Sequence, residues 1–438
     1  MDLFSSSLDL VKPREGGRSP GSEQSSTTPR EVYRIDRKRK WVVRAIHTRT
    51  KVVETTVDLL EGAPSDDPQS TFDWCWLRQH TKPVPCDDPK PIRIADMFAG
   101  CAQMSLGASE ACRALGRRGD VVLAVDSYPA AVAFCRRQYP EAVVEEAQVE
   151  KILSGVLKMG LTLRELQLRR DVGPVDLLIG GPPCQGHSNL NNRSRRHDAR
   201  NALGFRMIRA AKLFKPRHVV IENVLGIKND VGHVFSKMKN GLVELGYRVA
   251  EAVVRAEEFG VAQRRHRRFL VGTRVDGVDP AGALASAGIE QRPFTWACGD
   301  LEDTRDSLMN RHPVPKPQNQ RRIDYLFENK AYDLPPSQRP LCHQAGTAYT
   351  SSYGRISPNR PVQTITTTFQ CVGTGRFIHP TRPRPITLHE AARLQSIPDF
   401  VDFSGLNSTT IAQLIGNAVP PRVLYAIALR LLWEDPDV

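Results

Sequence analysis

The residue that the sequence places best for chemistry is Cys184, within the segment VDLLIGGPPCQGHS (175–188). Residues 175–179 are apolar except for Asp176, as expected of a strand buried on both faces of a parallel sheet. Two glycines and two prolines then turn the chain and end the strand. Open α/β sheets bind ligands just beyond the carboxyl ends of their strands, so Cys184 is a candidate nucleophile. Position alone favours this interpretation no more than a buried structural thiol.

Charged and amide side chains end the next predicted strand, over 218–224. If this strand neighbours residues 175–179, Glu222 and Asn223 lie beside Cys184. A thiolate and a carboxyl of raised pKa would then form a nucleophile and a proton donor. The alternative is that Glu222 caps a helix or forms an ion pair.

Arg265 and Arg267 precede the last predicted strand, in the segment Gln263-Arg-Arg-His-Arg267. A spacing of two residues places both side chains on one face of an extended chain. Paired guanidinium groups suit a phosphate or a base carbonyl. A charged edge strand is the alternative interpretation.

The loop from Asp96 to Gly107 follows the first predicted strand, over 92–98. Gly100 would let a ligand approach the backbone, and Asp126, at the end of the second strand, could accept hydrogen bonds from ribose hydroxyls. The loop contains few glycines and therefore suits a pyrophosphate poorly. A cofactor with one nucleoside and no phosphate fits better, and S-adenosylmethionine is such a cofactor.

The composition indicates a soluble protein with a polyanionic partner. The chain has 61 Lys and Arg against 48 Asp and Glu, a net charge of +13, which favours nucleic acid. The run Arg37–Lys40 either contacts phosphates or is a solvated charge run. The nine cysteines contain no C-x-x-C pair, so neither a disulfide framework nor a zinc site is predicted. No apolar run reaches the roughly 18 residues of a membrane-spanning helix, and no signal peptide is evident.

Strands and helices alternate from residue 92 to residue 273. Strands are predicted at 92–98, 121–125, 143–144, 175–179, 218–224, 248–254 and 268–271. The alternation predicts an α/β fold with a doubly wound, mostly parallel sheet. Right-handed crossovers would bring the loops at the strand ends to one edge.

Five segments are predicted. Residues 1–30 are a disordered tail, and residues 31–90 are a basic arm or a small appended β element. Residues 91–273 form the catalytic and cofactor-binding domain. Periodicity fails over 274–350, which we predict to be a smaller domain. Residues 351–438 return to the catalytic domain and end in helices.

Six motifs, in this order, resemble those of the DNA (cytosine-5) methyltransferase family: Phe98-Ala-Gly, Gly181-Pro-Pro-Cys-Gln185, Ile221-Glu-Asn-Val224, Gln263-x-Arg-x-Arg267, Glu390-Ala-Ala-Arg-Leu-Gln395 and Gly416-Asn-Ala-Val-Pro420. The resemblance covers residues 92–433 and implies a Rossmann-like methyltransferase domain that uses S-adenosylmethionine. It implies that residues 274–350 recognise the target, and that the protein is of the bacterial type, acting in restriction-modification.

The resemblance also implies the role of each catalytic residue. Cys184 would attack carbon 6 of a cytosine that has been flipped out of the helix. Glu222 would protonate or hydrogen-bond ring nitrogen 3, and Asn223 would hold the geometry. Arg267 would contact the flipped base, while Arg265 would support the pocket.

For the cofactor, family binding positions match the following residues: Phe98, Gly100, Asp126, Pro183, Asn417 and Val419. The chain departs from the family pattern at Ala102 and Gln103, where two glycines are usual. It departs again at Gln148, where an aspartate usually holds the adenine amino group. A glutamine oxygen can still accept that hydrogen bond. These departures bear on cofactor affinity more than on the type of reaction.

Nucleic-acid contacts are implied for the loop after the nucleophile and for one residue of a later motif, namely Gln185, Ser188, Arg193, Arg195 and Gln263. The loop, residues 186–200, resembles the segment that closes over flipped DNA. Side chains able to read base edges also occur in the predicted recognition domain, where they are equally interpretable as ordinary surface residues: Asn319, Gln320, Arg321, Arg322 and Gln344.

Double-stranded DNA is therefore the expected partner, together with a cognate restriction endonuclease. We expect a monomer in the bacterial cytoplasm or nucleoid that binds no membrane and no metal. Two alternatives stay open. One is the same chemistry on tRNA, which a branch of the family performs. The other is a nucleic-acid-binding relative with impaired catalysis, which the departures at Ala102, Gln103 and Gln148 suggest.

Overall fold

The computed structural model describes residues 29–64, 67–183, 203–229, 232–301, 307–344 and 351–438. Nearly all of the predicted tail over 1–30 lies outside the described residues. The same holds for five predicted site residues: Cys184, Gln185, Ser188, Arg193 and Arg195.

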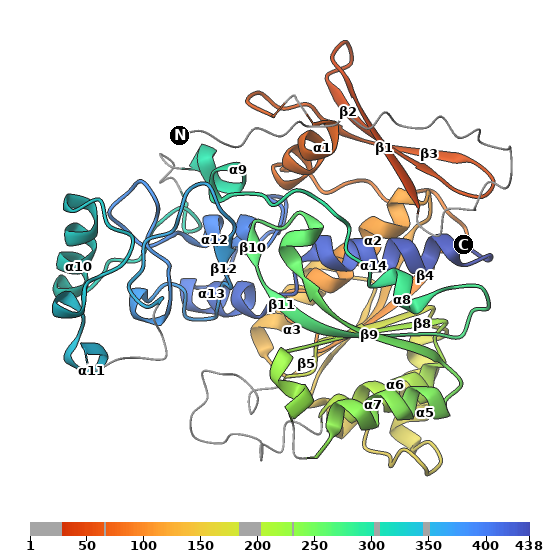
Figure 1. The fold of residues 1–438 in the computed structure, drawn as a ribbon. Coiled ribbons are helices and arrows are strands. Elements are labelled where there is room, and N and C mark those ends of the chain that lie inside the picture. The colour runs from red at the N-terminus through yellow and green to blue at the C-terminus, as the bar shows by residue number, and fades with distance from the viewer. Residues whose placement is uncertain (1–28, 65–66, 184–202, 230–231, 302–306, 345–350) are drawn as a thin grey trace, which may run out of the picture.

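A seven-stranded sheet forms the centre of the larger lobe, with strand order β6-β5-β4-β7-β8-β11-β9 (Figure 1). Its strands are β4 (Ile92–Met97), β5 (Gly119–Asp126), β6 (Val143–Glu146), β7 (Leu177–Gly180), β8 (His218–Asn223), β9 (Arg248–Arg255) and β11 (His266–Thr273). The predicted α/β fold with a mostly parallel sheet is confirmed. Among the described strands of this sheet, β11 alone runs in the direction opposite to the others. The short connection from β9 explains this, because a parallel return needs a longer crossover.

Helices cover both faces of the sheet (Figure 1). Those of the larger lobe are α2 (Gln103–Ala114), α3 (Pro129–Gln138), α4 (Val149–Ile152), α5 (Leu163–Val172), α6 (Gly204–Phe214), α7 (Val234–Glu244), α8 (Pro280–Ala283) and α14 (Pro421–Glu434). In β7, Leu177 and Ile179 pack toward α2 and α14, whereas Leu178 packs toward α5, α6 and α7. Successive residues of β7 are thus buried on opposite faces of the sheet, which explains why a central strand has an uninterrupted apolar run.

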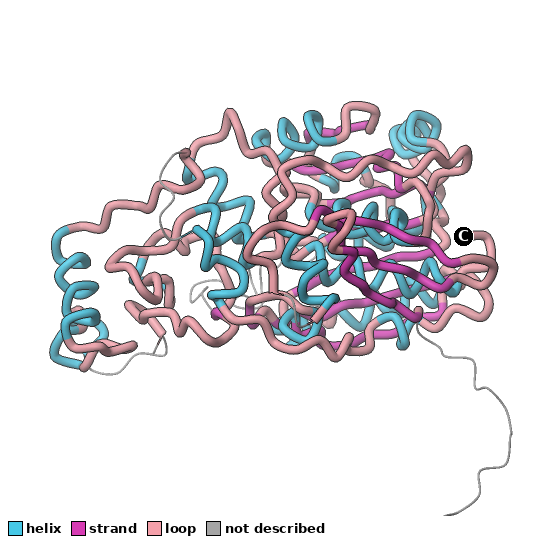
Figure 2. Tube along the Cα trace, turned by 90° about the horizontal axis from the view of Figure 1, so that it is seen from above, coloured by secondary structure: helices cyan, strands magenta, loops and turns pink. Residues whose placement is uncertain are grey.

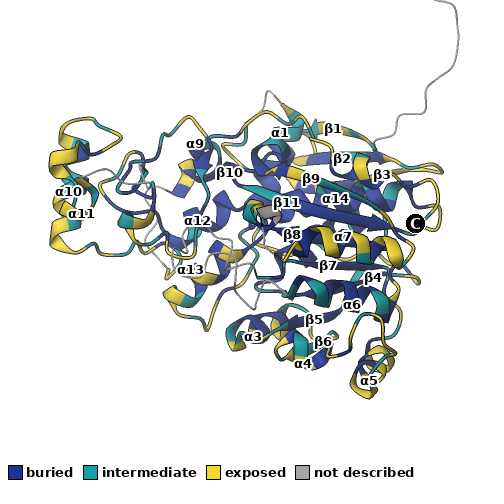
Figure 3. Ribbon diagram, turned by 60° about the horizontal axis from the view of Figure 1, so that its bottom comes forward, coloured by how far each residue is buried: buried dark blue, intermediate teal, exposed yellow. Residues whose placement is uncertain are grey.

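The smaller lobe consists mostly of helices and loops (Figure 2). Its elements are α9 (Phe294–Cys298), α10 (Pro317–Glu328), α11 (Leu341–Gln344), α12 (Leu388–Leu394), α13 (Ser408–Asn417) and the two-residue strand β12 (Val362–Gln363). Much of α10 and α11 is exposed at the end of this lobe (Figure 3). β12 pairs with β10 (Gln263–Arg264), so the two lobes also meet through a short ladder.

The packing of the lobes crosses the segment boundaries drawn from the sequence. Ala283, beyond residue 273, belongs to the core that α14 and β11 share. Ile323 and Leu326 of α10 pack with Val372 and Ile378, from the segment predicted to lead back to the catalytic domain. The sequence indicates that an apolar side chain will be buried, but it does not indicate which residues will pack against it. A segment boundary drawn from periodicity therefore misses contacts between distant segments.

The first described segment, which the sequence predicted to be a basic arm or a small appended β element, contains an appended sheet. Three antiparallel strands, β1 (Arg30–Asp36), β2 (Trp41–His47) and β3 (Val52–Asp58), are followed by α1 (Pro68–Leu77). Phe72, Trp74 and Trp76 of α1 pack against Val42 and Val57, which attaches the sheet to the body. Among the described residues, no helix is long and apolar enough to cross a membrane, and no cluster of His, Cys, Asp and Glu suits a metal ion.

Candidate active site

Glu222 lies at the carboxyl end of β8, between β7 and β11. A Cβ added to Gly181, which follows β7, would lie 3.3 Å from Glu222 Oε2. The carboxyl group is therefore next to the turn that leads to Cys184, although Cys184 itself lies outside the described residues. The parallel pairing of β7 with β8 brings these two strand ends together, as their order in the sequence suggested.

Arg267 forms an ion pair with Glu222, with 3.1 Å between Nε and Oε1. Both side chains are largely buried. Arg265 is buried deeper, and its Nη1 donates to the carbonyl oxygens of Ile365 and Gly416, each at 3.3 Å. Burial, followed by the nearby charge of Arg267, lowers the pKa of Arg265 to about 9. Arg267 therefore pairs with the carboxylate of Glu222, whereas Arg265 binds backbone carbonyls of the smaller lobe.

Asn223 is buried at the end of the same strand, and alternation along β8 directs it away from the face of Glu222. Its Oδ1 accepts a hydrogen bond from the backbone N–H of Val224 at 2.8 Å. Its Nδ2 has no partner among the residues that the structure describes. A buried donor of this kind needs an acceptor.

Gln263, predicted to contact nucleic acid, lies inside the protein at the junction of the two lobes. Its side chain is fully buried, and its Oε1 accepts the backbone N–H of Ile365 at 2.7 Å. Its Nε2 donates to the carbonyl oxygen of Leu394 and to Gln395 Oε1. Gln395 in turn donates to the carbonyl oxygen of Ile415 at 2.7 Å. The amide of Gln263 thus joins the lobes, and the contacts that bury it lie far away in the sequence.

The loop after β4 leaves open space next to Gly100. Phe98 and Gly100 both have positive φ, at 64° and 55°. The backbone N–H of Gly100 donates to Asp126 Oδ2 at 2.9 Å, and that of Tyr128 donates to Oδ1 at 2.8 Å. A Cβ at Gly100 would meet no heavy atom within 4 Å. Asp126 therefore fixes the loop with both carboxylate oxygens, and space for a ligand remains above the glycine.

The other predicted cofactor residues approach this loop from several elements. Gln148 is exposed just after β6, next to Ala147, whose N–H donates to the carbonyl oxygen of Asp126 at 3.1 Å. Asn417 is exposed at the end of α13, and Val419 is buried under the start of α14. Pro183 is half-buried and is the last residue described before the gap.

Comparisons with known proteins agree with this arrangement. The sequence pattern of the family described as "C-5 cytosine-specific DNA methylase" matches residues 92–433. The chain is 40% identical over 365 residues to the type II methyltransferase M1.BsuMI of Bacillus subtilis, covering 82% of this chain and 85% of that protein. The chain belongs to the C-5 cytosine-specific DNA methylase family.

Further similarities are more distant. The type II methyltransferase M.DdeI of Desulfomicrobium norvegicum is 28% identical over 395 residues, covering 79% of this chain and 90% of that protein. The crystal structure of the S. pombe Dnmt2 methyltransferase matches with a TM-score of 0.53 at 14% identity, covering 78% of this chain and 98% of that chain. This last similarity concerns the fold alone.

Two buried polar residues of this DNA methylase were not singled out as site residues. Asp96, at the end of β4, accepts a hydrogen bond from Ser105 Oγ at 2.6 Å. Burial, reinforced by the charge of Asp126, raises the pKa of Asp96 to about 7. Gln103 donates from Nε2 to the carbonyl oxygen of Cys101 at 2.7 Å, and its buried Oε1 has no partner among the described residues. A carboxylate near the end of a mostly apolar strand was the available signal for Asp96.

The candidate base-reading residues of the methylase lie on or near α10 and α11. Gln320 donates to Asp324 and to the carbonyl oxygen of Pro383. Arg322 donates to Asn319 Oδ1 at 2.8 Å, and Gln344 donates to the carbonyl oxygen of Arg339. These four side chains thus form hydrogen bonds within the smaller lobe, although Gln344 is exposed, as is Arg321.

Proposed function

We propose that this DNA methylase transfers a methyl group to carbon 5 of a cytosine flipped out of duplex DNA, with Cys184 as the nucleophile. The observation that carries the proposal is the position of Glu222, between Gly181 and Arg267 at the carboxyl edge of the sheet. A largely buried carboxyl group next to this turn can serve as a proton donor beside a nucleophile. The motif Gly181-Pro-Pro-Cys-Gln185 supplies that nucleophile.

The chemistry explains why a thiol and a carboxyl are needed together. Carbon 5 of cytosine is a weak nucleophile as long as the ring is aromatic. Addition of the Cys184 thiolate to carbon 6 breaks the aromaticity and directs electron density to carbon 5. Glu222 protonates or hydrogen-bonds ring nitrogen 3, which offsets the charge that gathers there. Carbon 5 then takes up the methyl group. When a base has removed the remaining proton from carbon 5, the C–H electron pair re-forms the 5,6 double bond as the sulfur–carbon bond breaks, which regenerates the Cys184 thiolate.

The two arginines and Asn223 position these groups. Arg267 holds the Glu222 carboxylate through the ion pair and can also reach the flipped base. Arg265 ties the strand to the smaller lobe through three backbone carbonyls, those of Ile365, Gly416 and Asn417. The Nδ2 group of Asn223, which has no partner among the described residues, is available to the turn around Cys184. Small errors in such positions lower rates strongly, because reacting atoms must be aligned.

The family implies S-adenosylmethionine as the methyl donor, and the loop after β4 fits it. The open space above Gly100 is where a cofactor can approach the backbone, because a side chain there would fill it. Phe98, Asp126 and Gln148 would hold the nucleoside, while Pro183, Asn417 and Val419 would complete the site. When bound, S-adenosylmethionine supplies a methyl group activated by a positively charged sulfur. The Gln103 side chain occupies part of the same loop and adds a buried acceptor, Oε1.

Contacts with the DNA backbone are proposed for Gln185, Ser188, Arg193 and Arg195, in the segment outside the described residues. Two of these are arginines, which suit phosphates. Because the relatives are named type II methyltransferases, we also propose a role in restriction-modification, with a cognate restriction endonuclease as the functional partner.

Trapping with 5-fluorocytosine tests the proposal. Fluorine cannot leave carbon 5 as a proton does, so the enzyme should stop as a covalent adduct through Cys184. A duplex pool of random sequence that contains 5-fluorocytosine avoids the need to know the recognition site. We expect an adduct only with S-adenosylmethionine present, and not in Cys184→Ala.

A matched control is Cys371→Ala, since Cys371 is an exposed cysteine of the smaller lobe. This variant should form the adduct normally. An adduct on fluorinated tRNA, with none on DNA, would replace DNA by RNA as the substrate. Cofactor binding without an adduct on either nucleic acid would contradict the catalytic proposal and favour an impaired relative.

A further inference from the structure

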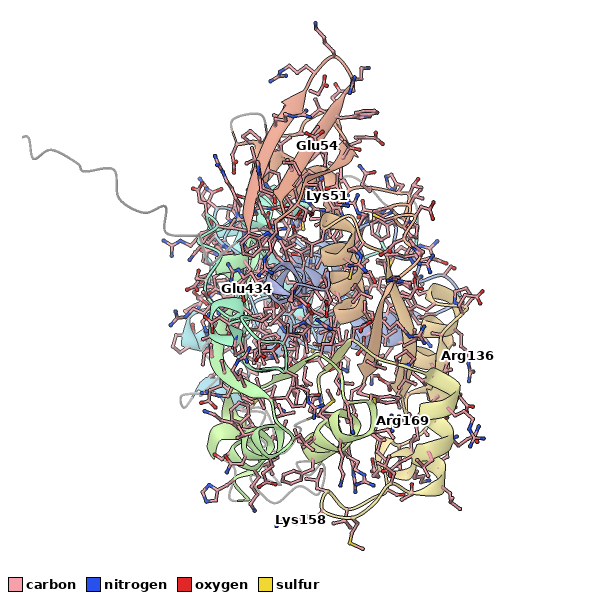
Figure 4. The ribbon with its side chains drawn as sticks, turned by 90° about the vertical axis from the view of Figure 1, so that its right-hand side faces the viewer. Lys51, Glu54, Arg136, Lys158, Arg169 and Glu434 are labelled. Atoms are coloured by element: carbon pink, nitrogen blue, oxygen red, sulfur yellow. The ribbon has the colours of Figure 1, made fainter. Side chains whose placement is uncertain are left out.

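The turn between β1 and β2 carries four consecutive basic residues, Arg37–Lys40, and all four are exposed. The appended sheet rises from the body at the end opposite Lys158, and this turn is at its far end (Figure 4). The acidic neighbour of the run, Asp36, lies 4.0 Å from Arg39. The cations outnumber the acid, so the turn has a net positive charge.

The turn has a defined backbone conformation. Asp36 Oδ1 accepts the backbone N–H of Arg39 at 3.0 Å. Lys40 has a φ of 54°, and its carbonyl oxygen accepts the N–H of Leu59 at 2.8 Å. The guanidinium of Arg39 lies over the ring of Trp41, 5.7 Å from its centroid. The basic side chains therefore project from a fixed support, which lowers the entropy lost when they bind an anion.

The sheet that carries the turn is fixed to the larger lobe. Arg44 of β2 is 1% exposed and donates to Glu110 of α2 at 2.8 Å and to Thr55 at 3.0 Å. At the other end of the sheet, Arg49 donates to the carbonyl oxygen of Glu434 at 2.9 Å. The sheet that carries the turn is therefore attached to α2 and α14, which lie beneath it (Figure 1).

We propose that the turn Arg37–Lys40 binds phosphates of DNA outside the stretch that contains the target cytosine. The sheet lies above α2 and α14, whereas Glu222 lies at the carboxyl edge of the central sheet. Four exposed cations on consecutive residues can neutralise backbone phosphates of a duplex, and the net charge of +13 gives the whole molecule the same preference. An exposed tryptophan next to the cations adds an apolar surface for a sugar. This contact carries no sequence information and adds affinity.

The test compares two variants that each replace three positively charged side chains by neutral, polar glutamines. The first is Arg37→Gln/Lys38→Gln/Lys40→Gln, which keeps Arg39 on Trp41. The matched control is Lys158→Gln/Arg169→Gln/Arg170→Gln, three exposed cations elsewhere on the larger lobe. Affinity for long and short random-sequence duplexes is measured from about 0.05 to 0.2 M salt.

We expect the first variant to bind the long duplex about tenfold to a hundredfold more weakly. Its salt slope should be lower by about one for each phosphate that the variant no longer neutralises. The control should bind almost as well as the wild type, and on a short duplex the two variants should differ little. Equal losses of affinity in both variants, or no loss in either, would overturn the proposal. The proposal would also be overturned if the first variant changed binding to polyglutamate but not binding to DNA, because the basic turn would then suit an acidic protein. These outcomes do not depend on Cys184 chemistry.

Discussion

Arg267 Nε lies 3.1 Å from Glu222 Oε1, so an ion pair connects β11 to β8 at the carboxyl edge of the sheet. The two strands are antiparallel neighbours, and their pairing brings an arginine from one motif to a carboxylate from another. In a largely buried setting, each charge depends on the other, because an unpaired buried charge is costly.

The first prediction concerns this pair. Glu222→Gln should lower single-turnover methyl transfer by at least about a hundredfold, the usual loss when a proton donor is removed. Arg267→Leu should lower it by a similar factor, since the carboxylate loses its support. The double variant should be no worse than Glu222→Gln, because the residues act as a unit. Multiplicative losses would show instead that Arg267 acts independently of Glu222.

The second prediction concerns the pH dependence of stability. Asp96 has its pKa raised from 3.8 in the unfolded chain to about 7 in the folded protein. Between these values the folded state binds more protons, so stability falls as pH rises, by at most about 1.4 kcal/mol per pH unit. Asp96→Asn removes this effect. In urea unfolding, its stability relative to the wild type should rise from pH 5 to about 7 and then level off. A constant difference across this range would contradict the raised pKa.

The third prediction uses two glycines of the same region. Gly100→Ala fills the open space above the loop, so it should weaken S-adenosylmethionine binding at least tenfold and cost about 1 kcal/mol in stability for the positive φ. Gly107→Ala should destabilise by about 3 kcal/mol through overpacking, because its Cβ would collide with Pro421 O where α2 packs on α14. Calorimetry of cofactor binding and urea unfolding separate the effects. Similar profiles for the two variants would contradict a cofactor site at Gly100.

The fourth prediction concerns the junction of the lobes. Gln263→Ala and Gln395→Ala should each destabilise by about 2 kcal/mol, since each leaves buried partners without a hydrogen bond. Their effects should be less than additive, because both variants break the hydrogen bond between Gln263 Nε2 and Gln395 Oε1. Urea unfolding of the single and double variants measures the coupling. A stable Gln263→Ala with weakened DNA binding would instead restore a nucleic-acid role for this residue.

The sequence by itself determined the α/β class and most strands of the central sheet. Alternation of strand and helix, and glycine and proline at strand ends, are local properties that follow from side-chain volume and backbone freedom. That Glu222 lies close to the turn after β7 was also predictable, because consecutive parallel strands tend to lie side by side. The motifs identified the family, and the match over residues 92–433 confirms it.

Only the tertiary structure decided which distant segments meet. In the sequence, Gln263 is an ordinary polar residue. In the structure its amide is buried, because Ile365 and Leu394 of the smaller lobe form hydrogen bonds with it. In the same way, α10 completes its core with Val372 and Ile378, beyond the boundary that periodicity suggested. A side chain's type indicates whether it can be buried or hydrogen-bonded. Its partners depend on how the whole chain packs, and no local pattern contains that information.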